Sequence, residues 1–389
     1  MKSDCLSILL VGDISLGGDL AESVVCNQTT WTSPFDPVLP LFRNADIRLG
    51  NLESPLSDGA FPCKKRNLVY APCEAVKALT HLDFTALSLA NNHITDQSDA
   101  GLEQTLELLK KHNIHAFGAG ISREQAESWP RISMGGFSFV LLGYAVIGED
   151  VGATSADVKC GGCIPFSLER AIVDVKAARK RNEQAIVSIH WGYQYDRYPS
   201  PDQVKTARLL IEAGALIVHG HHPHVIQGYE RYLHGAILYS MGNFYFPDFR
   251  RSDHVKFKFP KCSKQTGVAT CTVGAGGVEN ISFVPLEVRP NGQIQMLSSG
   301  LMAQALHEHE IRSKRIMFAD YAKKWSCEHN KTVRWRCRHE ARIALAAEIL
   351  RLRNLMTTRN VFKIRHHHFA RILSMCIKYV LLLSKMKAK

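Results

Sequence analysis

Residues 216–224 read Leu216-Ile217-Val218-His219-Gly220-His221-His222-Pro223-His224. The first three residues form a short apolar run, which is typical of a strand covered on both faces. Four histidines follow within six residues. Burying that many imidazoles without partners is unfavourable, so we expect them to bind something rather than only to pack.

Six more apolar runs rich in Ile, Val and Leu lie along the chain, at Ser7–Val11, Asp46–Leu49, Phe84–Leu89, Phe137–Leu142, Ala185–Ile189 and Ala236–Tyr239. Apolar residues at helical spacing lie between several of them, over residues 99–112, 168–181 and 204–213. This alternation of strand and helix predicts an α/β fold up to about residue 245. From about 268 to 297 the pattern changes to alternating strands, with a hairpin turn at Pro290-Asn291-Gly292.

Polar residues stand at the carboxyl ends of five of these runs: Asp13, Asn51 with Glu53, Asn91 to His93, His190, and the histidines after Val218. If the strands share one sheet, these side chains meet at one edge, where α/β proteins bind ligands. Carboxylates and imidazoles bind divalent first-row metals. Two such metals can clamp a phosphate and activate a water, and a nearby histidine can protonate the leaving oxygen. An isolated Asp or His at a strand end is otherwise commonly a turn residue or a core imidazole.

The charge of the chain is unevenly distributed. It has 389 residues and a formal net charge of +12, with 46% hydrophobic and 22% charged residues, which excludes wholesale disorder, collagen and coiled coil. Residues 311–389 contain 20 Lys and Arg against 4 Asp and Glu, whereas residues 1–310 contain 28 against 32. The mildly acidic body does not suggest a polyanionic substrate, so a small phosphoester is expected rather than a nucleic acid.

The basic tail is predicted to be helical from about residue 303. Its apolar end, residues 369–384, contains Arg371 and Lys378 and is too short to span a bilayer. It could lie on an anionic membrane as a basic amphipathic helix, or dock on the body or on another subunit. Few aromatic residues are interleaved with the charges, so nucleic-acid binding is not expected. The run His366-His367-His368 is interpreted as a solvated face.

The cysteines and the N-terminus indicate the compartment. There are 11 cysteines, an odd number, and the first apolar run is too short for a signal peptide and is interrupted by Asp13. We therefore expect a cytoplasmic protein with mostly reduced thiols. Cys160-Gly161-Gly162-Cys163 has the spacing of a metal or redox site, or is a glycine-rich loop with two incidental thiols.

Six ordered stretches make the chain resemble the CapA family of capsule and poly-γ-glutamate synthesis proteins, which is similar in fold to the calcineurin-like metallophosphoesterases. They are Val11-Gly12-Asp13, Gly50-Asn51-Leu52-Glu53, Leu89-Ala90-Asn91-Asn92-His93 with Asp96, His190-Trp191-Gly192 with Tyr195, Gly220 to Gln227, and Tyr239-Ser240-Met241-Gly242-Asn243-Phe244. The resemblance covers residues 5–247 and is weaker to about 300. It implies a four-layer α/β/β/α metallophosphatase-like sandwich over residues 1–300, followed by a basic helical C-terminal extension over 301–389.

The resemblance also implies roles for single residues. Asp13 would bind a first metal, Glu53 would bridge two metals, and His93 would be the catalytic imidazole. The other ligands would be Asn92, His190 and His222 at the second metal and His224 at the first. Gln194 and Asn243 would be the substrate-binding residues; Asn243 could orient a metal ligand or the substrate, or could instead serve a structural turn. The cofactor would be one or two divalent ions: Mn, Fe or Zn.

Two departures from the family patterns bear on catalysis. Ser15 stands where metallophosphoesterases usually have a histidine, and Gln194 stands where the CapA family has a glutamate. The first departure removes an imidazole from the first metal site and the second removes a charge near the edge, so both lower the expected catalytic efficiency. From the resemblance, the chain is expected to be a CapA-like capsule biosynthesis protein with a metal-dependent phosphoester hydrolase site. The alternative is a non-catalytic accessory protein that binds metal or an anionic polymer and is tethered peripherally to an anionic membrane by its basic tail.

Overall fold

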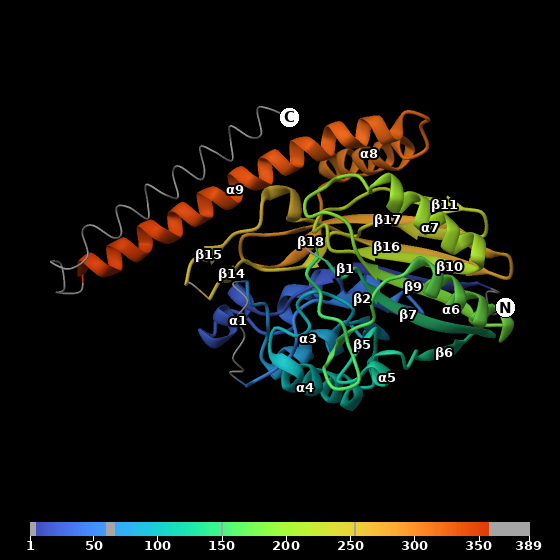
Figure 1. Ribbon diagram of the computed structural model, residues 1–389, viewed down its shortest axis with the longest axis horizontal. Coiled ribbons are helices and arrows are strands. Elements are labelled where there is room, and N and C mark those ends of the chain that lie inside the picture. The colour runs from blue at the N-terminus through green and yellow to red at the C-terminus, as the bar shows by residue number, and fades with distance from the viewer. Residues whose placement is uncertain (1–4, 60–66, 149–150, 253, 358–389) are drawn as a thin grey trace.

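The structure is a computed structural model that describes residues 5–59, 67–148, 151–252 and 254–357, with side chains described to residue 343. Its first sheet has eight strands (Figure 1). Their order is β18 (Ile294–Met296), β17 (Gly277–Val288), β16 (Gln265–Gly274), β1 (Leu6–Ile14), β2 (Ile47–Leu52), β3 (Ala86–Ser88) and β4 (His115–Phe117), and β13 (Asn243–Tyr245) pairs with β1. Strands β1 to β4 are parallel to one another.

The second sheet has six strands, in the order β11 (Tyr229–Tyr232), β12 (Gly235–Leu238), β10 (Ala215–His221), β9 (Gln184–His190), β7 (Phe137–Ala145) and β6 (Arg131–Met134). Strands β7, β9, β10 and β12 are parallel. Two short pairs complete the strands: β5 (Ala119–Gly120) with β8 (Gly162–Cys163), and β14 (Phe249–Arg250) with β15 (Lys256–Phe257).

Successive side chains of each strand face opposite sides of its sheet, so one side packs on the other sheet and the other side packs on helices. In β1, Ile8 and Leu10 face the second sheet, whereas Leu9 and Val11 face helices. The helices on that outer side are α1 (Gly18–Val25), α2 (Leu39–Arg43), α3 (Val76–His81) and α4 (Ser98–Lys111). The outer face of the second sheet is covered by α6 (Leu168–Lys180) and α7 (Pro201–Ala213), and α5 (Arg123–Ala126) lies beside β5. The expected α/β/β/α sandwich is therefore confirmed.

The sequence argument assumed that the strands ending in polar residues share one sheet. This assumption is wrong, because they belong to two sheets. Strands β1, β2 and β3 belong to the first sheet, and β9 and β10 belong to the second. The polar residues still meet, because the carboxyl ends of the parallel strands of both sheets lie at the same edge of the sandwich. Asp13, His190 and His221 are also inside their strands rather than after them. The hairpin turn predicted near Asn291 is confirmed between β17 and β18.

Local sequence explains how α7 is positioned. Ser200 caps its first turn: the Ser200 hydroxyl accepts from the Gln203 backbone N–H, and the Gln203 side chain accepts from the Ser200 N–H. Pro201 occupies the first turn, where its missing N–H is harmless. The helix ends at Gly214, whose φ of 115° suits glycine. This helix packs its apolar face on the second sheet and returns the chain to β10.

Two long helices follow the strands: α8 (Ser299–Arg315) and α9 (Tyr321–Thr357). In Figure 1, α8 lies against the sandwich, and α9 runs along one side and extends past it. Among the described residues, no helix combines the length and the apolar character that crossing a membrane requires. The apolar segment 369–384 and the histidine run 366–368 lie outside the described residues.

The Cys160–Cys163 stretch holds no disulfide bond in the part of the chain that the structure describes. Cys160 is exposed, and Cys163 is buried with its thiol 3.2 Å from the Asn91 carbonyl oxygen. Neither cysteine forms a disulfide bond within the described residues. The glycine-rich loop is therefore the interpretation that fits, and Cys163 serves packing behind the turn that carries Asn91.

Candidate metal centre

Three buried side chains from three strands meet at the edge shared by the two sheets. Asp13 is near the end of β1, Glu53 directly follows β2, and His190 ends β9. One ligand atom from each lies within 4.8 Å of the others, so the three could hold a metal ion. Each side chain has a relative exposure of 1% or less.

Glu53 is the least compensated group at this edge. Its Oε1 lies 3.9 Å from Nε2 of His93, 3.9 Å from Nε2 of His190 and 3.8 Å from Nε2 of His224. Within the described residues, neither carboxylate oxygen of Glu53 takes part in a hydrogen bond. A buried carboxylate without partners is strongly unfavourable. A cation between this oxygen and the three imidazoles would satisfy it, so the residues present fit a divalent metal.

Asp13 is held in place by its neighbours. It accepts hydrogen bonds from Asn51 Nδ2 at 2.8 Å and from the His222 backbone N–H at 3.2 Å. Nδ1 of His221 is 3.4 Å away and Nδ1 of His224 is 3.3 Å away. Burial raises the pKa of Asp13, but these two histidines outweigh burial and hold the pKa well below its usual value. Asp13 is therefore ionised at neutral pH.

The pKa of Glu53 moves in the opposite direction. Burial raises it most, and the negative charges of Asp13 and Asp96 raise it further. Two carboxylates in one dry site cannot both ionise easily unless a cation offsets them. The opposite directions of the Asp13 and Glu53 pKa values therefore fit a site in which a bound cation would let both carboxylates ionise.

His190 joins the second group of predicted ligands. Its Nε2 lies 2.9 Å from Asn92 Oδ1 and 3.1 Å from His222 Nδ1. Burial lowers the pKa of His190, and the neighbouring His222 lowers it further. The ring is therefore neutral, which is the form that binds metals. The structure brings Asn92, His190 and His222 together beside Glu53.

His93 stands on the turn after β3 and is more exposed than His190, His221 and His224. Its side chain is 13% exposed. Its Nδ1 lies 2.7 Å from Asp96 Oδ2, and that same oxygen accepts from the Val69 backbone N–H at 2.9 Å. The carboxylate fixes the ring and leaves Nε2 directed toward Glu53. Asp96 lies three residues after His93 in the same motif, and its role becomes visible only in the folded protein.

Asn243 lies behind the site. It is buried, its Oδ1 is 2.8 Å from His224 Nδ1, and its Nδ2 donates to the Ser263 carbonyl oxygen at 3.3 Å. Asn243 therefore orients His224. Gln194, the other residue predicted to contact substrate, lines the cavity above His93 and His224. Ser15, at the position where related enzymes have a histidine, is buried next to β1.

Backbone conformation at the site is strained. His222 has a φ of 96°, His224 of 56° and Tyr195 of 67°. Non-glycine residues rarely adopt this left-handed region, and they keep it only where the surrounding structure holds them there. Here the strain turns the histidine pair after β10 toward Asp13 and Glu53. It supports a functional rather than a packing role for these histidines.

Some residues that support the predicted metal ligands were not predicted from the sequence. Asn91 donates to Asn51 Oδ1 at 3.1 Å and to the Leu52 carbonyl oxygen at 2.8 Å, which connects the turn after β3 to β2. His221 is fully buried beside Asp13. Asn51, Asn91 and His221 could have been predicted from the sequence, because they lie inside the six motifs. Arg251, which lines a cavity beside His93, lies outside the six motifs and could not have been predicted from them.

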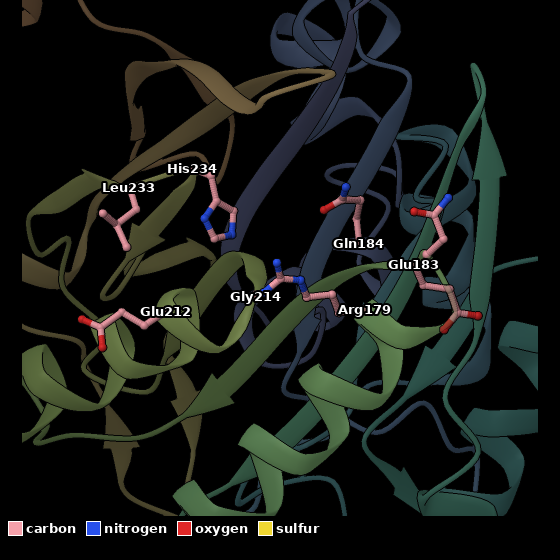
Figure 2. Close-up of a pocket in the computed structure, with 8 residues that line it drawn as sticks. Arg179, Glu183, Gln184, Glu212, Gly214, Leu233 and His234 are labelled. Carbon is pink, nitrogen blue, oxygen red and sulfur yellow. The ribbon is translucent and has the colours of Figure 1, made fainter.

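A cavity of about 300 Å³ opens on His93 and His224. Part of its wall is aromatic, from Phe246, Phe249, Phe257 and Phe259. Another hollow of about 380 Å³, drawn in Figure 2, is lined by Arg179, Gln184, Glu212 and His234. It lies at the amino-terminal ends of β9 and β10, the opposite end of the strands from Asp13. It contains none of the predicted site residues, whereas the cavity beside His93 is bordered by three of them, His93, Gln194 and His224.

Over residues 7–248 the chain matches the family described as "Bacterial capsule synthesis protein PGA_cap". The chain belongs to this capsule synthesis family. Similar relatives are the "Capsule biosynthesis protein CapA" of Bacillus anthracis, 34% identical over 63% of this chain and 61% of the relative, and the "PGA biosynthesis protein CapA" of Bacillus subtilis (strain 168), 34% identical over 63% and 64%. The chain thus matches less than two thirds of the length of either relative.

Among solved structures, the capsule synthesis chain is similar to a 5'-nucleotidase precursor from Thermus thermophilus. The TM-score is 0.43 at 15% identity, over 79% of this chain and 58% of that one. It is also similar to the sulfate thiohydrolase SoxB of Thermus thermophilus, with a TM-score of 0.40 at 10% identity, over 72% and 45%. Likenesses of this strength carry no argument about activity.

Proposed function

We propose that this member of the capsule synthesis family is a metal-dependent phosphoester hydrolase. The observation that carries the proposal is the buried Glu53 carboxylate, which faces three histidine nitrogens at 3.8–3.9 Å and has no hydrogen bond within the described residues. Such a carboxylate is costly in a protein that only needs to fold. A cation makes the arrangement favourable.

Asp13, Glu53 and His190 would hold the ion, with Asn92, His222 and His224 at hand as further ligands for one or two ions. This mixed set of oxygen and nitrogen donors suits Mn, Fe or Zn. When bound there, a divalent ion supplies Lewis-acid chemistry, polarising the phosphoryl oxygens and lowering the pKa of a water.

His93 would transfer the proton. Asp96 fixes its Nδ1, so Nε2 is presented at the cavity, where it can donate a proton to the leaving oxygen of the ester. Arg251 brings a positive charge to the same cavity, which suits a phosphate group. The volume of about 300 Å³ suits a small phosphoester.

The test begins with elemental analysis of the full chain, purified with and without added Mn²⁺ or Zn²⁺. We expect one to two equivalents per chain, and loss of that metal in the double variant Glu53→Ala/His222→Ala. The loaded protein should then hydrolyse a generic phosphomonoester or phosphodiester, and His93→Ala should abolish turnover while metal content persists. No turnover by loaded wild type on a broad panel would refute the hydrolase.

The second candidate function is an accessory protein of capsule polymer assembly that binds metal or polymer carboxylates without hydrolysis. The absence of an imidazole at Ser15 and of a carboxylate at Gln194 favours it. A relative from Mycobacterium tuberculosis, 32% identical, is named a probable polyglutamine synthesis accessory protein. Stoichiometric metal together with no turnover, and binding of poly-γ-glutamate by the loaded protein, would select this function.

A further inference from the structure

One face of α9 packs along the segment that follows β9. Tyr321 donates its hydroxyl to the Pro199 carbonyl oxygen at 2.5 Å, and His329 Nδ1 lies 2.6 Å from Asp196 Oδ2. Trp325 stacks on His329 with ring centroids 4.7 Å apart. Residues 321, 325 and 329 are four apart, so they share one face of the helix. This face holds α9 against the same segment that begins with the metal-site residue His190.

The next contact along α9 leads toward the metal centre. The Trp335 ring meets the Tyr195 ring edge to face, at 5.5 Å and 88°. The Tyr195 backbone N–H donates to the Pro223 carbonyl oxygen at 2.8 Å, and its ring centroid is 6.4 Å from that of His224. Tyr195 is 7% exposed. A single buried tyrosine therefore separates α9 from a predicted metal ligand.

Beyond Trp335, the helix enters the wall of the cavity itself. His339 stacks on Trp335 at 5.1 Å, and His339, Glu340 and Ile343 line the cavity with His93 and His224. These three residues of α9 come from a part of the chain that lies outside the matched range 7–248. The cavity of about 300 Å³ is at the small end for ligand sites, and α9 supplies part of its boundary.

We propose that α9 is a wall of the substrate site, and that it limits the site to phosphoesters whose group beyond the phosphate is about one ring in size. That the substrate is a phosphoester rests on the proposed function. That α9 covers His93 does not depend on the proposed function. In this arrangement Trp335 fixes the helix on Tyr195, and Ile343 sets the depth available to the substrate.

The first arm of the test needs no activity. Metal-free full-length protein is treated with diethyl pyrocarbonate, and carbethoxylation of each histidine is followed by mass spectrometry. The double variant Trp335→Ala/Ile343→Ala should increase the rate at His93 several-fold, while buried His190 stays protected and reports an intact fold. Arg338→Ala, at an exposed position of the same helix, is the matched control. An unchanged carbethoxylation rate at His93 in the double variant would overturn the proposal that α9 forms a wall of the site.

The second arm measures selectivity. With metal-loaded protein, the ratio of kcat/KM for phenyl phosphate over 1-naphthyl phosphate should fall several-fold in Ile343→Ala and stay constant in Arg338→Ala. If wild type hydrolyses neither ester, the proposed function fails, and the same ratio is taken from the dissociation constants of the two compounds by calorimetry. An unchanged ratio, or binding of neither compound, would overturn the size limit.

Discussion

At the scale of single residues, the site depends on how each imidazole is oriented. His93 and His224 each use Nδ1 for a side-chain oxygen, Asp96 Oδ2 at 2.7 Å and Asn243 Oδ1 at 2.8 Å, and each leaves Nε2 facing Glu53. A partner on one ring nitrogen fixes the position of the other, which matters for a metal ligand and for a proton donor alike. Asp96 and Asn243 are thus as important for the geometry of the site as the two histidines that they orient.

Asp96→Asn tests this orientation. Asparagine keeps the size of the side chain but removes the charge that fixes the His93 ring and its proton. We expect kcat/KM for a phosphoester to fall about 100-fold, the size of a lost acid–base contribution, with metal content unchanged. Steady-state kinetics and elemental analysis together measure this. Asp202→Asn, at an exposed position of α7, is the control, and equal activity of both variants would contradict the role of Asp96.

At the scale of elements, the close contact between β1 and β13 positions the site. The Asp13 backbone N–H donates to the Gly242 carbonyl oxygen at 2.8 Å, and Asp13 is paired with Asn243. A Cβ on Gly12 would come within 1.9 Å of that carbonyl oxygen. Glycine at position 12 is therefore what allows the strand carrying Asp13 to lie against the strand carrying Asn243.

Gly12→Ala is expected to lower the free energy of unfolding by about 1–3 kcal/mol, the usual cost of forcing extra atoms into a packed core. It should also reduce metal content, because β13 must move away from Asp13. Urea unfolding and elemental analysis measure the two effects. Gly276→Ala is the matched control, since a Cβ there meets nothing within 4 Å, and similar losses in both variants would disprove the steric explanation.

The docking of α8 makes stability depend on pH. His309 is buried on α8, with Nε2 3.0 Å from the Gln227 carbonyl oxygen and its ring 4.1 Å from that of Phe283. Burial lowers the pKa of His309 to about 3, and the charge of Arg312 contributes. The folded protein keeps this ring neutral, whereas the unfolded chain takes up a proton below about pH 6.5. Stability therefore falls as pH drops from about 6.5 toward 3.

His309→Gln should remove this dependence while retaining a donor for Gln227. Between pH 7 and pH 5, the wild type should lose about 2 kcal/mol more of its unfolding free energy than the variant, from the linkage of one depressed histidine. Urea unfolding at the two pH values measures the difference. Parallel losses in both proteins would show that other groups control the pH response.

At the scale of the whole molecule, an acidic body carries a basic C-terminal segment. Residues 311–389 contain 20 Lys and Arg, and residues 1–310 contain 28 against 32 Asp and Glu. Part of the segment packs on the sandwich through α8 and α9, while residues beyond 357 lie outside the described structure. Excess positive charge on one part of a protein suits an anionic surface.

We propose that this segment brings the protein to anionic membranes as a peripheral contact. Full-length protein should cosediment with vesicles of phosphatidylglycerol and phosphatidylcholine, and not with vesicles of phosphatidylcholine alone. Each basic residue near such a surface contributes about 1 kcal/mol, and salt screens the attraction, so release at roughly 0.5 M salt is expected. Equal retention by both kinds of vesicle would rule out this electrostatic attraction.

The α/β class and most of the residues at the edge can be read from the amino-acid sequence alone. Continuous apolar runs such as Leu216–Val218 appear as buried strands because burial on both faces requires them. Asp13, Glu53 and His190 could be found because each stands in a short motif at a strand end. These signals are local, so one sequence is enough to read them.

Only the tertiary structure decided which distant residues meet. It assigned each strand to one of the two sheets, placed Asn243 against His224, and brought Ile343 of α9 to the cavity beside His93. These contacts join residues far apart in the chain through packing, whereas a motif or a periodic pattern describes only the residues next to it in the sequence.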